Sequence, residues 1–391
     1  MTRRRGLAAA IGLAALIAVA TAVWGFSRQS ASGASGGTSN ALGVVFTVFE
    51  NLPPIGACSG LYSVDAQTRR ITYLGGLDDA RSDSAVYPAF TAGGAFSYGH
   101  WVDTTANVPL VDVFAGQKKV ARALVFTGWA WSPRREEVAY GRLEGRRLDL
   151  VLGSVDGSQR VLARNAGPGV SWLPNGSGLL YVRRDGPTYV ISFVRRDGSG
   201  RRDVARNALF PVVSPDGRRF AFVRNADTRP ELWVSALRGG RAKRLLGPAG
   251  YEELRPAVWL STRELLTQHG GQEDPNFDVG DRVTRLDVVT GRERPFLPRA
   301  YVLSRSPDGR RVLFVRRHGG GEYYYSIRTV TTAGREERLL AVADEEDMNI
   351  RSWPVWKPAG TELSYIGDPL PARVSVEECV RRVTSLRDRT R

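Results

Sequence analysis

Arginine and histidine recur at one position of a repeated pattern in this 391-residue chain. In most repeats the cation stands two residues after an aromatic residue or a threonine, as Arg142 does after Tyr140. The cations at this position are His100, Arg142, Arg183, Arg224, His269 and Arg316. A guanidinium group donates two parallel hydrogen bonds to one phosphate or carboxylate. A row of these side chains could therefore bind an anionic ligand.

The loops before three of these repeats contain no acidic residue. Residues 126–128, 165–168 and 207–211 are free of aspartate and glutamate, whereas the loops before the two histidine repeats are acidic. We therefore predict that the arginines are not neutralised locally and that they form an anion-binding face. The residues predicted for this face are Arg142, Arg183, Arg184 and Arg224, with His100, His269 and Arg316 as secondary candidates. The alternative is that the arginines lie over aromatic side chains such as Trp172.

Other patterns that carry chemistry are missing from the sequence or incomplete. No Gly-x-Ser-x-Gly elbow occurs in the repeat region, where 176–178 and 198–200 each lack the first glycine. The sequence has neither a Cys/His zinc spacing nor a phosphate-binding loop. Asp274, Asn276, Asp278 and Asp281 approach the spacing of a calcium loop, but the glycine comes one place late and Arg285 replaces the bidentate glutamate. No catalytic residue, metal or cofactor is therefore predicted.

The cations belong to repeats about 40 to 50 residues long. The repeats begin at Phe90, Trp131, Trp172, Val213, Trp259, Arg305 and Trp356. Each contains a short apolar strand, a turn that is often Pro-Asp-Gly or Pro-Asn-Gly, and then further strands separated by turn residues. Four antiparallel strands per repeat, without helical periodicity, predict an all-β propeller of four-stranded blades.

Two copies of the turn carry a family resemblance. The segments 214–222 (SPDGRRFAF) and 306–314 (SPDGRRVLF) resemble the WD40-like repeat of TolB-type propellers, and the resemblance extends over about residues 43–368. It implies the propeller fold. It does not imply one activity, because such repeats also occur in prolyl-oligopeptidase-like peptidases and in some carbohydrate lyases.

Both ends of the repeat region are expected to close the ring, which we assign to residues 43–370. Residues 44–49, 61–64 and 70–74 resemble the later strands of a blade, while 354–356 and 362–366 resemble its inner strand and the next one. Seven blades are expected, or eight if the first segment forms a blade of its own. Residues 371–391 are expected to contain a short amphipathic helix.

The two cysteines stand at opposite ends of the repeat region, so ring closure would bring Cys58 and Cys379 together. A disulfide is predicted, since an exported protein meets oxidising conditions. The alternative is two buried thiols that never meet.

The N-terminus carries a membrane signal. Residues 1–5 are basic, 6–26 are uncharged and long enough to span a bilayer, and 27–42 form a Ser/Gly-rich linker. The segment 6–26 is predicted to be a transmembrane anchor or a cleaved signal peptide, with the C-terminal domain outside the cytoplasmic membrane. Nucleic acid is not expected as a partner of an exported protein, despite the net charge of +15.

These features predict a non-enzymatic binding or scaffold module of the cell envelope. The expected partner is an envelope protein or an anionic envelope polymer. The alternative is a carbohydrate-active enzyme, similar to a polysaccharide lyase, that would use His269, Arg316 and Tyr324.

Overall fold

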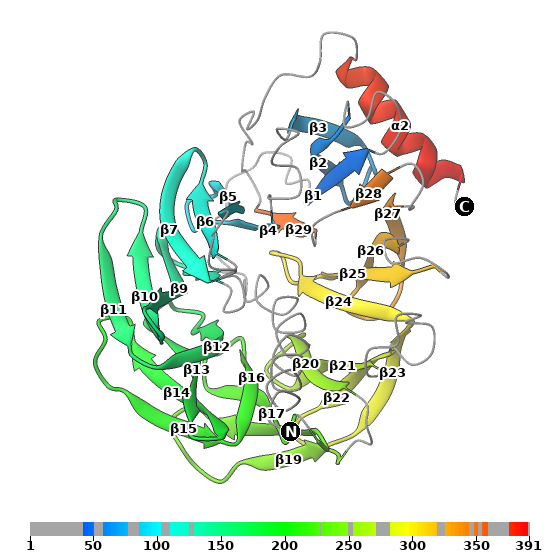
Figure 1. Cartoon of the computed structure of the whole chain (residues 1–391). Helices are drawn as coiled ribbons and strands as arrows, with labels where there is room; N and C mark the ends of the chain where they lie inside the picture. Colours follow the sequence, from blue (N-terminus) through cyan, green and yellow to red (C-terminus); the bar gives the residue numbers. More distant parts are fainter. Residues whose placement is uncertain are drawn as a thin grey trace, which may run out of the picture.

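The computed structural model forms a ring of β-sheets around a central axis (Figure 1). It describes residues 42–50, 58–76, 86–102, 110–124, 129–226, 228–248, 253–270, 282–318, 325–343, 348–350, 354–358 and 375–389. Within these residues the chain forms seven sheets and one helix. The predicted all-β propeller is confirmed, and its blades number seven rather than eight.

The segment predicted to cross the membrane, residues 6–26, lies outside the described ranges, as do most of the linker and the calcium-like residues between 274 and 281. In the portion of the chain that is described, no helix is both long and apolar enough to span a membrane.

Six blades consist of four strands that follow one another in the chain and pair antiparallel. Blade 1 contains β4 (Val86–Phe90), β5 (Phe96–Val102), β6 (Leu110–Ala115) and β7 (Lys118–Leu124). Blade 2 contains β8 (Trp129–Trp131), β9 (Glu137–Glu144), β10 (Arg147–Ser154) and β11 (Gln159–Ala163). Blade 3 contains β12 (Ala166–Trp172), β13 (Gly178–Asp185), β14 (Thr188–Arg195) and β15 (Arg202–Arg206).

The next three blades repeat this order. Blade 4 contains β16 (Ala208–Val213), β17 (Arg219–Arg224), β18 (Glu231–Ala236) and β19 (Lys243–Leu246). Blade 5 contains β20 (Glu253–Trp259), β21 (Glu264–Gly270), β22 (Arg282–Asp287) and β23 (Glu293–Pro298). Blade 6 contains β24 (Ala300–Arg305), β25 (Arg311–Arg317), β26 (Tyr325–Thr331) and β27 (Arg338–Val342).

The Ser-Pro-Asp-Gly turns owe their shape to their own side chains. In blade 4 the Ser214 hydroxyl donates to Oδ1 of Asp216 (2.6 Å), and the backbone N–H of Arg218 donates to the same oxygen (3.0 Å). Gly217 has a φ of 68°, in the left-handed region that favours glycine. The turn at 306–309 of blade 6 has the same bonds. Local chemistry therefore fixes where the first strand of a blade ends and the second begins.

The seventh, closing blade combines both ends of the repeat region. It contains β1 (Gly43–Glu50), β2 (Gly60–Asp65) and β3 (Ile71–Gly76), and its inner edge is formed by β28 (Met348–Ile350) and β29 (Val355–Lys357). Both inner strands pair with β1, for example Ile350 with Val48 and Trp356 with Val44. Ring closure by the two terminal segments is thus confirmed. The strand predicted at 362–366 lies outside the described ranges, and the strand that pairs with both inner segments in the described part of the chain is β1.

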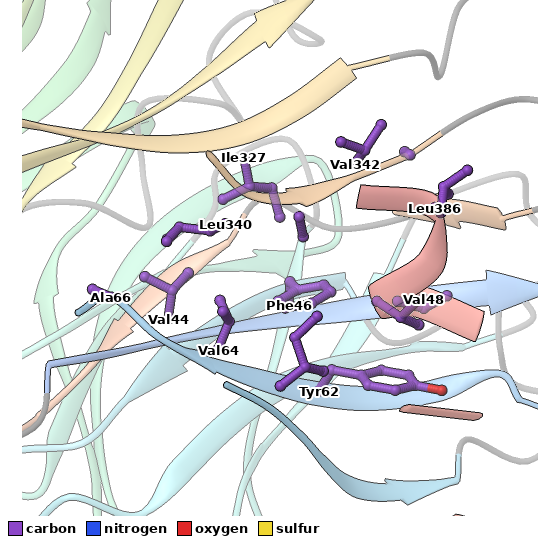
Figure 2. Packing of buried hydrophobic residues seen from close by; sticks show 14 of the residues in the cluster. Val44, Phe46, Val48, Tyr62, Val64, Ala66, Ile327, Leu340, Val342 and Leu386 are labelled. Atoms are coloured by element: carbon purple, nitrogen blue, oxygen red, sulfur yellow. The ribbon is translucent and has the colours of Figure 1, made fainter. Parts of the chain in front are cut away.

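A buried hydrophobic cluster joins the closing blade to blade 6 and to helix α2 (Val376–Arg389) (Figure 2). The helix begins as predicted, because the Ser375 hydroxyl accepts a hydrogen bond from the backbone N–H of Glu378 (3.1 Å). Cys379 of α2 forms the predicted disulfide with Cys58, and their Cα atoms are 5.2 Å apart. Cluster members from the three parts include Val44, Phe46, Tyr62, Ile327, Leu340, Val383 and Leu386.

Tryptophan side chains link neighbouring blades. The indole N–H of Trp172 in blade 3 donates to the carbonyl oxygen of Ala130 in blade 2 (2.9 Å). The indole N–H of Trp259 in blade 5 donates to the carbonyl oxygen of Val212 in blade 4 (3.0 Å). These side chains are also buried, so each contributes apolar packing and one directional bond to an interface between blades.

Candidate functional site

The predicted row of cations occupies equivalent positions near the end of the second strand of blades 1 to 6. Arg183 lies opposite Ala166 of the inner strand, Arg224 opposite Ala208, and Arg316 opposite Ala300. In the closing blade the equivalent residue is Val48 of β1, which is buried and apolar. These cations therefore occupy one structurally equivalent position in successive blades. Whether they can bind a ligand depends on whether carboxylates of the protein already pair with them.

Arg142 pairs with a carboxylate of its own strand. Its Nε atom lies 2.7 Å from Oε1 of Glu144, and its Nη1 donates to Oε1 of Gln159 (3.2 Å). Asp149, directly opposite on β10, is buried and is held by Arg147. The charge of Arg142 is thus balanced inside blade 2.

Arg183 pairs with two carboxylates of blade 3. Its Nη2 donates to Oδ2 of Asp203 (2.9 Å), and its Nη1 lies 3.6 Å from Oδ1 of Asp185. The bond from Arg183 lowers the pKa of Asp203 below its ordinary value, so the aspartate stays ionised to lower pH. Arg184, the next residue, is exposed and donates to the carbonyl oxygen of Gly186 (3.1 Å).

Arg224 lies over aromatic rings of blade 4. Its guanidinium carbon is 4.3 Å from the centre of the Trp233 ring and 5.6 Å from that of Phe222. This is the arrangement named above as the alternative, with Trp233 in place of Trp172.

The prediction that these arginines are not neutralised locally is wrong for Arg142 and Arg183. The acids that balance them come from inside the same blade, whereas the prediction considered only the loops between blades. Together with the stacking of Arg224, this leaves no row of unpaired charges on blades 2 to 4 within the described residues.

His269 lies in a buried polar network. Its Nε2 atom is 2.8 Å from Oε1 of Glu293 and 3.2 Å from the hydroxyl oxygens of Thr267 and Thr284. The hydroxyl of Thr284 also donates to Glu293 (2.6 Å). A catalytic relay needs the acid on one ring nitrogen and the nucleophile on the other. Here acid and hydroxyls meet at the same nitrogen, which is the geometry of a packing network.

Arg316 shares an acid with a neighbouring arginine. Its Nη2 donates to Oε2 of Glu337 (3.1 Å), and Arg328 donates to Oε1 of the same carboxylate (2.8 Å). Tyr324, grouped with Arg316 and His269 in the enzyme alternative, lies outside the described residues. In blade 1, the ring of His100 packs edge-on against Phe114, and the structure gives its buried Nε2 no hydrogen-bond partner among the described residues.

The structure also contains a hydroxyl–imidazole pair that the sequence analysis missed. Nε2 of His318 lies 2.7 Å from the hydroxyl oxygen of Ser326, which also accepts a bond from Arg328 (2.7 Å). Burial lowers the pKa of His318, and the charges of Arg328 and Arg316 lower it further. Ser326 is completely buried, so a substrate cannot reach its hydroxyl. No sequence signal marks the pair, since seven residues separate its members.

No set of three or more His, Cys, Asp or Glu side chains in the described ranges is placed to hold a metal ion.

Replacing Arg183 by glutamine is expected to lower the free energy of unfolding at neutral pH by about 1 kcal/mol. Because the folded-state pKa of Asp203 is lowered, the stabilisation is complete above the ordinary value of 3.8 and is lost as the pH falls through the lowered pKa. Chemical denaturation at neutral pH should show the lower stability of the variant. At a pH below the lowered pKa of Asp203, the variant and the parent should be equally stable. Arg184→Gln is the control and should leave stability within about 0.5 kcal/mol. Equal losses at both pH values would contradict the ion-pair explanation.

No protein-family model matches this sequence, and no curated protein matches it. Solved structures do share its fold. TolB from Acinetobacter baumannii superimposes with a TM-score of 0.48 at 15% identity, over 82% of this chain and 68% of TolB. A puromycin-hydrolysing peptidase from Mycobacterium tuberculosis gives 0.51 at 16% identity, over 85% of this chain and 55% of the peptidase. An oligogalacturonate lyase in complex with manganese gives 0.42 at 14% identity, over 53% of this chain and 62% of the lyase.

At these identities the likeness concerns the fold alone. The predicted similarity to TolB-type propellers is confirmed at that level. This chain spans little more than half the length of the peptidase.

Proposed function

We propose that this propeller is an exported, non-enzymatic binding or scaffold module of the cell envelope, held at the cytoplasmic membrane by residues 6–26. The observation that supports export most directly is the disulfide between Cys58 and Cys379. Such bonds persist in extracytoplasmic compartments and are rare where cellular thiols are kept reduced.

The environment of the chemistry-bearing residues supports binding rather than catalysis. His269 and Ser326 are buried, and Arg142, Arg183 and Arg316 are each paired with a carboxylate of their own blade. A closed ring of blades presents a wide, rigid surface to a macromolecular partner. We propose an envelope protein or an anionic envelope polymer as that partner.

Protease accessibility tests the location. In spheroplasts of the native host, added protease should degrade the domain formed by residues 42–391 while cytoplasmic marker proteins survive. Detergent should release the full chain from membranes, and high salt alone should not. Degradation only after lysis would show that the domain is cytoplasmic and would overturn the proposal.

Photo-crosslinking tests the binding function. A photoreactive residue at Arg184 or Arg229, both exposed on the face of the loops between blades, should give a discrete adduct in intact cells. A probe at Val289, an exposed turn residue on the other face, provides the comparison. Absence of any adduct from all three positions would contradict a binding or scaffold function.

A further inference from the structure

Six exposed arginines gather on the face of the propeller that carries the turns between the first and second strands and between the third and fourth strands of each blade, called the turn face below. They come from three turns in blades 3 and 4: the one between β14 and β15, the one between β16 and β17, and the one between β18 and β19. Within the described residues, none of the six forms an ion pair with a carboxylate. The turn-face arginine patch consists of Arg195, Arg201, Arg218, Arg219, Arg238 and Arg241.

The three turns are tied to one another at Leu237. Its backbone N–H donates to the carbonyl oxygen of Arg218 (2.8 Å), and its carbonyl oxygen accepts a bond from Nη2 of Arg202 (2.9 Å). Arg202 in turn lies over the ring of Phe193 in blade 3, 4.2 Å from its centre. The backbones that carry the patch are therefore held in a fixed arrangement across two blades.

The nearby acids are engaged by their own turns. Asp197 accepts the backbone N–H of Ser199 (2.8 Å), and Asp216 accepts the Ser214 hydroxyl and the N–H of Arg218. Two aspartates against six arginines leave the patch strongly positive. Its charges, unlike those of the row near the loops between blades, are available to a partner.

The chain enters the propeller on this same face. The carbonyl oxygen of Leu42 accepts a hydrogen bond from the N–H of Ala66 (2.7 Å), which lies in the turn between β2 and β3. That turn joins the third and fourth strands of the closing blade, as the β14–β15 and β18–β19 turns do in blades 3 and 4. The described part of the chain thus begins at the turn face.

The closing blade and the patch lie on opposite sides of the ring. Blades 1 and 2 separate β1 from blade 3, and blades 5 and 6 separate it from blade 4; Figure 1 shows β1 to β3 at the top and β15 and β19 at the bottom. The N-terminal attachment and the patch are therefore two widely separated points on one face.

We propose that the turn face lies against the membrane and that the patch binds the anionic headgroups of its lipids. The proposal rests on the proposed function, because it requires residues 6–26 to anchor the chain. Only 15 residues, 27–41, separate the proposed anchor from Leu42, and a Ser/Gly-rich sequence of that length has an average end-to-end distance of roughly 20 Å, so this face would stay near the bilayer. Tethering raises the effective concentration of headgroups around the patch, which favours lipid over a diffusing polymer as its ligand.

Vesicle binding by the ectodomain tests this proposal. Residues 42–391 contain every strand of the ring and both cysteines, so the ectodomain carries the whole described fold. It should co-sediment with vesicles containing one third phosphatidylglycerol and not with vesicles of phosphatidylcholine alone. Binding should weaken as salt rises, since the attraction is ionic.

Matched triple variants separate the patch from net charge. Each arginine near an anionic surface contributes about fivefold in binding, so Arg218→Gln, Arg238→Gln and Arg241→Gln together should lower binding about 100-fold. The control removes three exposed arginines from the opposite face and should change binding less than about fivefold. The control substitutions are Arg164→Gln, Arg184→Gln and Arg229→Gln. Melting temperatures should match the parent in both variants.

Three results would overturn the proposal: no preference for phosphatidylglycerol, equal losses in the two triple variants, or arginine-dependent binding to soluble polyphosphate without vesicle binding. The last would identify the ligand as a polymer. None of these results affects the protease-accessibility test, so failure of the lipid proposal is distinguishable from failure of the proposed export and anchoring.

Discussion

Replacing Cys58 and Cys379 together by alanine is expected to lower the free energy of unfolding by about 2 to 5 kcal/mol. The disulfide joins residues 321 positions apart, so it removes a large amount of conformational freedom from the unfolded chain. In the folded state it fastens α2 to the blade that closes the ring. Guanidinium denaturation of the oxidised ectodomain and of the variant measures the effect as a shift in the unfolding midpoint.

Reduction of the parent protein provides the matched comparison. A reductant should move the parent midpoint toward that of the double variant and leave the variant where it is. If the variant and the oxidised parent unfold at the same denaturant concentration, the bond does not stabilise the ring.

Trp259→Ala is expected to cost about 3 to 5 kcal/mol of stability. The side chain is almost completely buried between blades 5 and 4, and the substitution removes both its volume and its bond to the carbonyl oxygen of Val212. The unfolding midpoint of the ectodomain again gives the measurement.

Trp259→Phe distinguishes packing from hydrogen bonding at this interface. Phenylalanine retains most of the apolar ring and loses the N–H donor, so the expected loss is smaller, about 1 to 2 kcal/mol. A phenylalanine variant as unstable as the alanine variant would mean that the single bond, rather than ring burial, holds the two blades together.

The blades were predictable because their turns are specified locally. A serine, an aspartate and a glycine at fixed spacing satisfy their own backbone groups, whatever lies beyond the turn. The fifth repeat lacks Pro-Asp-Gly, yet Ser261 accepts the backbone N–H groups of Arg263 and Glu264 and forms a comparable turn. The fifth blade could be predicted as well, because the apolar pattern of its strands persists on both sides of this turn.

The pairing inside the closing blade could not be read in the same way. Residues 44–49 and 362–366 are both short apolar segments, and either can lie beside an inner strand. The pairing of β1 depends on contacts with β29, about 300 residues away in the chain. The periodicity of a strand shows which residues share a face and does not identify a distant partner strand.

The environment of the arginine row depended on register. Arg183 and Asp203 are 20 positions apart and meet only because β14 pairs with both of their strands. The composition of the loops between blades could not reveal these partners, because Asp203 lies on the fourth strand of its blade and Glu144, the partner of Arg142, lies on the same strand as the arginine. The row itself was found correctly, because equivalent positions in a repeat need no long-range information.

Closure by the last strands also sets an order of events during synthesis. Blades 1 to 6 each contain consecutive strands and can form as they emerge, whereas β1 is made first and its inner partners about 300 residues later. At ordinary translation rates, about 15 to 60 s pass between the synthesis of β1 and that of its inner partners, and during this time one edge of β1 is unpaired. A chain interrupted before residue 348 keeps that edge open and can pair it with another chain. A nascent-chain chaperone would therefore be needed most at the earliest strand.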